Sequence, residues 1–163
     1  MDETDVAKAM KDYGDIVLRV AKSITGNRED SEDVFSDTFF ALWQKVSSFS
    51  SSTHLKAWLI RVTINKAKNI VKSAYNRYKT ELTENIPFIE KEVTMSEARV
   101  KKAMLSLKPA DRAVIYLYYY EGYGFEEIAG MLQMRVNGVR SKISRARLKM
   151  REMLSMQIDK TNE

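Results

Sequence analysis

Basic side chains are concentrated in one stretch of the chain that has no acidic residue. Between Thr38 and Lys79 the sequence carries eight bases, which are Lys45, Lys56, Arg61, Lys66, Lys68, Lys72, Arg77 and Lys79. Residues 1–37 have the opposite balance, with ten acids and five bases. A basic surface suits a polyanion, because neutralising phosphates supplies most of the non-specific affinity for nucleic acid. The pattern therefore predicts nucleic acid as one partner, and an acidic surface that faces a basic protein or water.

The acids with the most regular spacing are Asp30, Asp33 and Asp37, which lie at i, i+3 and i+7. This spacing places them on one face of a helix. Three carboxylates on a helix face can be imagined as a metal site of an enzyme. Such a face is more often a solvated or protein-docking surface, and no histidine or cysteine joins it. We therefore expect a docking surface, with no catalytic residue, no metal and no cofactor.

The composition argues against several other classes of protein. The chain has no cysteine and one histidine, His54, so a disulfide framework and a thiolate or histidine metal site are not expected. The longest apolar run, from Ala113 to Tyr120, has eight residues, which is too short to cross a bilayer. The acidic start lacks the basic and apolar segments of a signal peptide. We expect an intracellular, cytoplasmic protein that does not insert into a membrane.

The elements that must position these charges are helices. Apolar residues recur every three or four positions over residues 5–25, Gly26 follows as a helix end, and a second helix is expected from near Glu29. Its predicted inner face comprises Val34, Phe35, Thr38, Phe39, Leu42, Trp43 and Val46. A third helix is predicted from about Leu55 to Tyr78, with an inner face of Trp58, Leu59, Val62, Ile70 and Val71. Its outer face has bases beside asparagines, which suits phosphate and base contacts together, although a plain solvated surface has the same composition.

A polar loop from Ser47 to Thr53 separates the second and third predicted helices and contains one aromatic residue, Phe49. An exposed phenylalanine in a serine loop is suited to stack on a base or wedge between bases. A phenylalanine that turns back onto the protein would instead anchor the loop. The sequence leaves both interpretations open.

The second half of the chain has a linker and further helices. Residues 79–95 are polar, acidic and contain a proline, and Thr94 to Glu97 has the spacing of a capping box. Pro109 fits the first turn of the next helix, which is expected to end near Gly122.

Two helices at about 125–132 and 137–154, separated by a tight connection, then have the spacing of a helix-turn-helix. From Met134 to Arg151 there are seven bases and no acid. The last helix is predicted to bury Val139, Ile143, Ala146 and Met150.

Three segments together resemble the extracytoplasmic-function group of bacterial sigma factors, in the sigma-70 family, over about residues 8–155. Residues 29–43 are similar to the family's helix that docks on the polymerase clamp. The segment that begins Lys56-Ala57-Trp58-Leu59 and runs through Asn65 and Asn69 looks like its promoter-melting, −10-reading helix. Phe125-Glu126-Glu127-Ile128-Ala129, followed by residues 139–147, looks like its −35-reading helix-turn-helix. Three such segments in this order are specific to the group.

The resemblance implies an all-α protein with two small helical domains joined by a flexible linker. Residues 1–78 would dock on core RNA polymerase and melt the −10 region, residues 79–95 would be the linker, and residues 96–163 would read the −35 element. The implied function is that of a dissociable sigma factor, in which the polymerase makes the bonds. The implied partners are core RNA polymerase and promoter DNA, and an anti-sigma factor is a further candidate because the family often uses one. The alternative is a helix-turn-helix regulator that does not engage core polymerase, which would need neither the acidic face nor the Phe49 loop.

The resemblance also implies three sets of site residues. The set for polymerase docking is Asp30, Glu32, Asp33, Ser36 and Asp37. The set for −10 DNA is Phe49, Lys56, Arg61, Asn65, Lys68, Asn69 and Lys72. The set for −35 DNA is Asn137, Arg140, Ser141, Lys142, Ser144, Arg145 and Arg147.

Four positions differ from the family pattern. Gln133 stands in the helix-turn-helix turn where the family often has glycine, and Gly138 stands where threonine is usual. Gly124 replaces the usual serine cap, and Ser36 replaces a frequent glutamine. We expect Asn137 to cap the last helix in place of the missing threonine.

Overall fold

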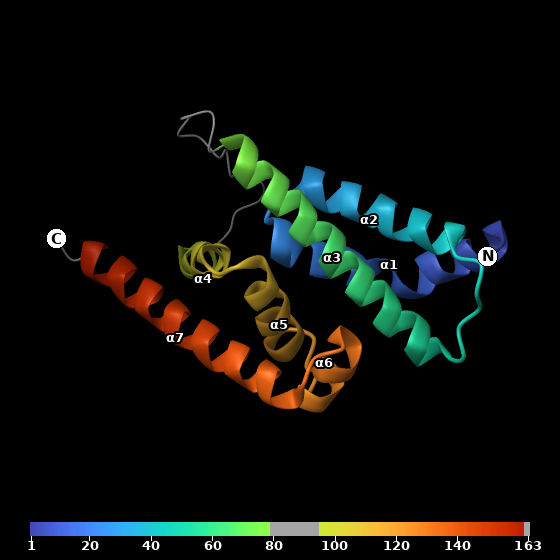
Figure 1. Cartoon of the computed structure of the whole chain (residues 1–163). Coiled ribbons are helices and arrows are strands. Elements are labelled where there is room, and N and C mark those ends of the chain that lie inside the picture. The colour runs from blue at the N-terminus through green and yellow to red at the C-terminus, as the bar shows by residue number, and fades with distance from the viewer. Residues whose placement is uncertain (79–94, 162–163) are drawn as a thin grey trace.

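Seven helices make up the described part of this protein, which a computed structural model covers at residues 1–78 and 95–161. They are α1 (Glu3–Thr25), α2 (Arg28–Gln44), α3 (Ser52–Tyr78), α4 (Met95–Ser106), α5 (Pro109–Tyr119), α6 (Phe125–Leu132) and α7 (Val136–Thr161). Helices α1 to α3 form a first group and α4 to α7 a second. Figure 1 shows α3 crossing the molecule diagonally, with α2 on one side and α5 and α6 on the other. The predicted all-α class is confirmed within these ranges.

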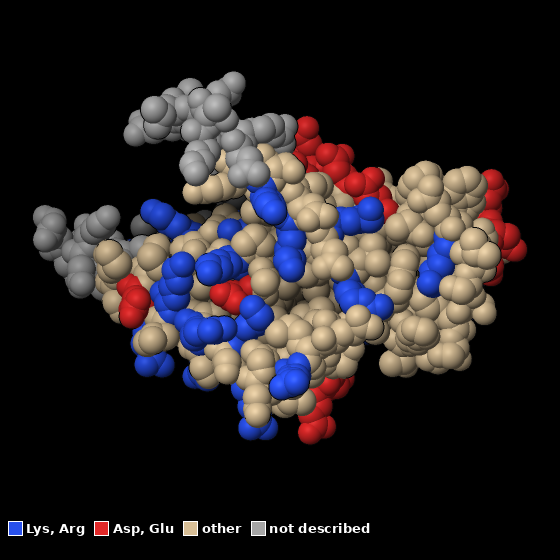
Figure 2. All heavy atoms as spheres, viewed as in Figure 1, with Lys and Arg blue, Asp and Glu red and all other residues tan. Residues whose placement is uncertain are grey.

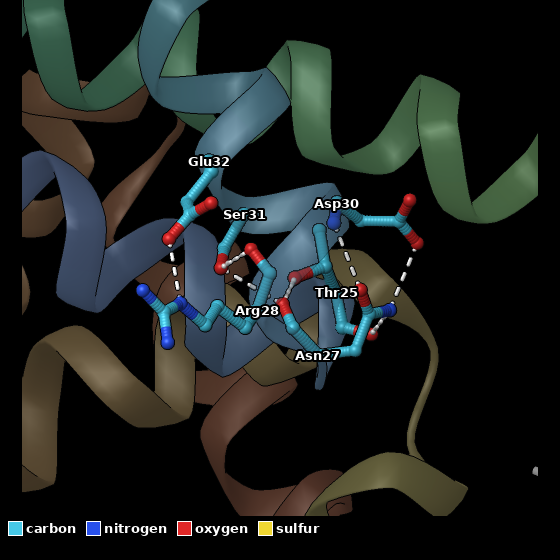
Figure 3. Close-up of polar contacts among 6 residues, drawn as sticks. All are labelled: Thr25, Asn27, Arg28, Asp30, Ser31 and Glu32. Carbon is cyan, nitrogen blue, oxygen red and sulfur yellow. Dashed lines mark hydrogen bonds and ion pairs between the residues drawn. The ribbon is translucent and has the colours of Figure 1, made fainter. Parts of the chain in front are cut away.

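A short turn after α1 fixes the direction of α2. Gly26 ends α1 with a φ of 75°, a left-handed conformation that glycine adopts without a side-chain clash. Asn27 caps α2, because its Oδ1 accepts from the Asp30 N–H at 2.8 Å while its Nδ2 donates to Asp30 Oδ2 at 2.8 Å (Figure 3). The Ser31 hydroxyl donates to the Asn27 carbonyl at 2.8 Å (Figure 3). These bonds determine where the acids of α2 lie.

The starts of two helices differ from the predictions for identifiable reasons, and α7 ends at Thr161, beyond the predicted residue 154. Helix α3 begins at Ser52, before the predicted Leu55, because Ser51 Oγ accepts from the His54 N–H at 3.1 Å in the manner of an N-cap. Helix α7 begins at Val136, so Asn137 lies inside its first turn and the prediction that Asn137 caps the helix is wrong. The predicted linker, apart from Met95, and the predicted cap at Thr94 lie outside the described residues.

The two helical groups share the larger of two hydrophobic clusters. A smaller cluster of buried residues holds α1 to α3 together and comprises Ala9, Val17, Phe39, Leu42 and Leu59. The larger cluster joins both groups and includes Ile24, Ile60, Ile64, Met104, Leu107, Val114, Leu117 and Ile128. Helix α1 also contacts α5, and α3 contacts α5 and α6. The second group therefore covers a face of α1 and α3 in this structure.

Two predicted inner faces need correction. Helix α3 buries Leu59 as predicted, but its other buried residues are Ile60, Thr63, Ile64 and Ala67, whereas Trp58, Val62, Ile70 and Val71 are half-buried. The physical reason is that α3 is covered on two sides, by α1 and α2 and by α5 and α6.

In α2, Trp43 was predicted to lie inside but is 49% exposed, and Val46 is fully exposed because the helix ends at Gln44.

The turn between α6 and α7 contains a strained residue. Gln133 has a φ of 54° and a ψ of 46°, the left-handed region that is unfavourable for a residue with a Cβ atom. The Met134 N–H donates to the Ala129 carbonyl at 2.9 Å and closes the end of α6. At the start of α6 the Gly124 N–H donates to Glu127 Oε1 at 3.2 Å, so glutamate contributes a cap where glycine has no side chain to offer. The helix-turn-helix predicted from spacing is confirmed.

Candidate functional site

Asp30 and Glu32 of the predicted docking set on α2 are bonded to neighbouring side chains. Asp30 is bonded to the Asn27 side chain, and Glu32 accepts from Arg28 Nε at 2.7 Å (Figure 3). Asp33, Ser36 and Asp37 are exposed. Figure 2 shows acidic side chains gathered along the edge of the molecule where α2 runs in Figure 1. The exposed carboxylates are the part of the set that is best placed to meet a basic protein surface.

A shallow groove between α2 and α3 brings two of the predicted sets together. It is lined by Asp30, Asp33, Asn69, Ile70 and Ser73. Asp30 and Asp33 belong to the docking set, whereas Asn69 belongs to the −10 set. The surfaces predicted for polymerase and for DNA are therefore adjacent on the first helical group.

An apolar surface beside the acids was missed by the sequence prediction. Phe40 and Trp43 are 53% and 49% exposed, and their ring centroids lie 5.8 Å apart. Both belong to α2, which also carries Asp33 and Asp37. Exposed aromatic pairs of this kind are typical of protein interaction sites. The i, i+3 spacing of the two residues is a usable signal, but the apolar pattern predicts Trp43 to lie in the core.

The −10 set on α3 is not uniformly accessible. Asn65, Asn69 and Lys72 are exposed, whereas Lys56, Arg61 and Lys68 are half-buried. Arg61 Nη1 donates to the Met131 carbonyl of α6 at 3.2 Å. Lys56 Nζ lies 5.4 Å from the centroid of the Tyr123 ring, between α5 and α6. Two of the predicted DNA-binding cations are therefore in contact with the second helical group.

Phe49 turns back onto the first helical group. Its ring lies 5.4 Å from that of Trp58 and 5.3 Å from that of His54, measured between centroids and nearly perpendicular in the second case. Lys45 Nζ lies over both the Phe49 and the Trp58 rings, at 5.3 and 5.5 Å. This arrangement is the loop anchor that the sequence left open as one alternative. Stacking of Phe49 on a base stays a prediction.

The −35 set on α7 is mostly on the outside. Exposed members are Asn137, Arg140, Ser141, Ser144, Arg145 and Arg147, and the predicted inner residues Val139, Ile143 and Ala146 are buried, with Met150 half-buried. Arg140 lies 5.2 Å above the Phe125 ring. Lys142 is instead half-buried and forms an ion pair of 3.4 Å with Asp111 of α5. Figure 2 shows basic side chains along α3 and over the second group near α7.

A polar network joins α1 to the end of α5. Arg19 Nε donates to Glu121 Oε1 at 2.8 Å and its Nη2 donates to Glu121 Oε2 at 3.3 Å. The Tyr116 hydroxyl donates to Glu121 Oε1 at 2.8 Å. The bond from Arg19 lowers the pKa of the Glu121 carboxyl, whereas burial, followed by the bond to Glu121, raises the pKa of Tyr116. The Glu121 carboxylate therefore stays charged and the Tyr116 phenol stays neutral across a wide pH range.

Among residues 1–78 and 95–161, no three acidic or histidine side chains are grouped closely enough to hold a metal ion. In the same ranges no helix is both long enough and apolar enough to cross a membrane.

Comparison with known proteins gives two family matches and relatives that align over most of this chain. The family model for sigma-70 region 2 matches residues 9–77, and that for sigma-70 region 4 matches residues 97–150. RNA polymerase sigma factor NccH of Alcaligenes xylosoxydans xylosoxydans is 26% identical, over 94% of this chain and 88% of that protein. ECF RNA polymerase sigma factor SigE of Mycolicibacterium smegmatis is 29% identical over 93% of this chain, which spans 62% of the length of that relative.

Among solved structures, the fold is similar to that of the sigma factor RpoE in complex with the anti-sigma factor NepR from Bartonella quintana. The TM-score is 0.73 at 22% identity, and the match covers 93% of this chain and 97% of that chain. At this identity the likeness shows the fold alone.

Proposed function

Because this chain belongs to the extracytoplasmic-function group of the sigma-70 family, we propose how its two helical groups divide the work of a dissociable sigma factor that directs RNA polymerase to promoters. The observation that carries the proposal is the presence of both regions in order on one chain. Region 2 corresponds to the helices with the adjacent acidic and basic surfaces, and region 4 to the helix-turn-helix. In this proposal residues 1–78 and 96–163 act as the two domains and residues 79–95 connect them.

Docking on core polymerase is assigned to α2. Asp33 and Asp37 offer exposed carboxylates, and Phe40 and Trp43 add apolar area on the same helix. Charged pairs mainly guide encounter and orientation, whereas buried aromatic side chains supply most of the energy of an interface. We therefore add Phe40 and Trp43 to the docking set.

Contact with the −10 region is assigned to α3 and the loop before it. Asn65, Asn69 and Lys72 are exposed and can reach an unpaired strand directly. Lys56 and Arg61 can do so only after leaving their partners in the second group. This surface suits an opened duplex, because bases become available for stacking or hydrogen bonding only after they leave the helical stack.

Contact with the −35 element is assigned to the exposed side of α7. The N-terminal part of a recognition helix meets base edges in the major groove, which favours Arg140, Ser141, Ser144 and Arg145 for readout. Arg147 lies further along the helix and suits phosphate. Lys142 is less suited than expected, because it is paired with Asp111.

In this proposal the chain performs no catalysis, acts in the cytoplasm with RNA polymerase, and is held in check by an anti-sigma factor. The last point is supported by the solved RpoE complex, in which a protein of this fold binds an anti-sigma factor.

The proposal is tested by run-off transcription with purified core polymerase over a promoter library. We expect discrete transcripts that require this protein. Binding to promoter DNA without co-purification of core polymerase, and without transcripts, would favour the helix-turn-helix regulator instead.

A further inference from the structure

An exposed arginine of α7 lies over an aromatic ring of α6. The Arg140 guanidinium carbon is 5.2 Å from the centroid of the Phe125 ring. Phe125 is the first residue of α6, and Arg140 lies near the start of α7, so the contact joins the two helices of the helix-turn-helix. The face of an aromatic ring attracts a guanidinium and does not bind its N–H groups as a carboxylate would. Arg140 is therefore oriented by α6 while its N–H groups stay available to a ligand.

The Phe125 ring is itself held by a second aromatic residue. It lies parallel to the ring of Tyr118 in α5, with centroids 5.0 Å apart and 2° between the ring planes. Tyr119 contacts the Tyr118 ring edge-on, at 4.9 Å between centroids and 88° between planes. Tyr118 and Phe125 are half-buried, whereas Arg140 is exposed. Paired aromatic rings stabilise each other beyond their burial, so Tyr118 keeps Phe125 in place beneath Arg140.

The surroundings of Arg140 disfavour a phosphate group. A shallow hollow beside the ring is lined by Gly124, Phe125, Glu126, Glu127 and Arg140. Both glutamates are exposed, and the Glu127 carboxylate accepts from the Gly124 N–H at 3.2 Å. Carboxylates repel a phosphate, whereas a base edge carries no net charge. Arg140 is therefore better suited to a base edge, such as the two acceptors of guanine, than to the DNA backbone.

We propose that Phe125, held by Tyr118, is a positioning residue that fixes the Arg140 guanidinium for readout of one base of the −35 element. This inference rests on the proposed function, which assigns α7 to that element. A free arginine side chain has many rotamers, and the contact with the ring removes part of this freedom before DNA binds. Such preorganisation strengthens the contact with the preferred base and leaves phosphate contacts elsewhere unchanged. Phe125 therefore acts on base discrimination and not on general affinity for DNA.

The first experiment measures the ring contact by NMR in the full chain without DNA. An aromatic ring current shifts protons above the ring upfield, so the Arg140 Cδ protons should resonate upfield of those of the exposed Arg145. Phe125→Leu keeps an apolar side chain and removes the ring, so the upfield shift should be lost. Phe125→Tyr keeps the ring and should keep the shift. An unchanged shift in Phe125→Leu would show that the ring does not hold Arg140.

The second experiment measures base preference with the assembled holoenzyme, which is this protein with core RNA polymerase. The promoters carry each base in turn at every −35 position, and Arg140→Ala identifies the position that Arg140 reads. Phe125→Leu should reduce the preference at that position by about two- to fivefold, the range for an exposed cation–π contact. Preferences at other positions and the salt dependence of binding should not change. Phe125→Tyr should restore the wild-type preference.

Combined variants distinguish positioning from direct contact of the ring with DNA. If Phe125 acts through Arg140, adding Phe125→Leu to Arg140→Ala has no further effect on base preference. Additive losses would mean that the ring itself meets DNA, and the positioning role would be wrong. The matched control is Tyr120→Leu, which removes an exposed ring of α5 that stacks on Tyr116 and should leave base preference unchanged.

The remaining outcomes separate this inference from the proposed function. If the wild-type holoenzyme does not form or has no −35 preference, the proposed function fails together with the readout role, whereas the Arg140 proton shift still tests the ring contact. If the wild type has a preference that Phe125→Leu does not alter, the proposed function stands and the positioning role is refuted. Equal losses at every −35 position in Phe125→Leu would assign the ring a purely structural role and also refute it.

Discussion

Replacing Arg112 by methionine should destabilise the protein and uncouple its two helical groups. The substitution keeps much of the volume and removes the three hydrogen bonds that this buried side chain donates to the carbonyls of Ile24, Leu105 and Leu107. Bonds from a charged donor are worth about 1.5–3 kcal/mol each, or roughly 5–9 kcal/mol together, and relief of the desolvation of a buried cation offsets several kcal/mol of this. We therefore expect a net loss of about 3 kcal/mol in the free energy of unfolding. For a chain of this size that corresponds to a fall in Tm of roughly 6–12 °C.

Tryptophan fluorescence can report the uncoupling of the two helical groups. Both of its tryptophans, Trp43 and Trp58, lie in the first helical group, whereas circular dichroism reports on helices throughout. In urea the two signals should fall together in the wild type, because the groups share the larger hydrophobic cluster. In Arg112→Met the dichroism should begin to fall before the tryptophan fluorescence.

The matched control is Arg145→Met, at an exposed position of α7, which should change the unfolding free energy by no more than about 0.5 kcal/mol. A change as small as this in Arg112→Met, with coincident transitions, would refute the bridging role.

Three further outcomes follow from the geometry. Reversing both Asp33 and Asp37 to lysine should weaken core polymerase binding by about tenfold with unchanged helicity, and normal binding would show that α2 is not the docking helix. Arg140→Ala should relax base preference at a −35 position by about 1–3 kcal/mol. Arg147→Ala should weaken binding to all promoters alike and lower the salt dependence of binding by about one unit of slope. If both variants lost affinity uniformly, base readout by α7 would be contradicted. Gln133→Gly should raise the free energy of unfolding, measured in urea, by about 0.5 kcal/mol, because relief of the left-handed strain exceeds the entropic cost of glycine. A loss of stability would mean that the glutamine side chain makes a compensating contact.

Helix boundaries and faces that depend on residues close in sequence were predictable from the sequence. Helix α6 was placed at its observed bounds because its apolar periodicity and the breaks that flank it lie within a few residues. The start of α3 was missed because four polar residues, Ser50 to Thr53, offer several equivalent caps, and only the structure shows that Ser51 is used. The buried side of α7 followed directly from 3.6-residue spacing.

Features that depend on contact between the two groups could not be read in this way. Ile60 and Ile64 belong to a side of α3 that has no reason to be buried unless a second partner covers it. Arg112 lies directly before an apolar run, and its pattern gives no sign that it is buried or that it reaches Ile24 from 88 residues away in sequence. The accessible part of the candidate site was predictable, whereas the covering of Lys56 and Arg61 was not.

The shared core sets a free-energy cost on separating the two helical groups. Ile24, Ile60 and Ile64 lie in the same cluster as Leu107 and other residues of the second group, so separating the groups exposes apolar surface at a cost of about 25 cal/mol for each Å². A partner that separates them must offset this cost, and phosphates compensate only the cations. Core polymerase, which the α2 surface with Phe40 and Trp43 is proposed to meet, can supply apolar contacts. A partner that separates the two helical groups must therefore bind apolar surface as well as cations.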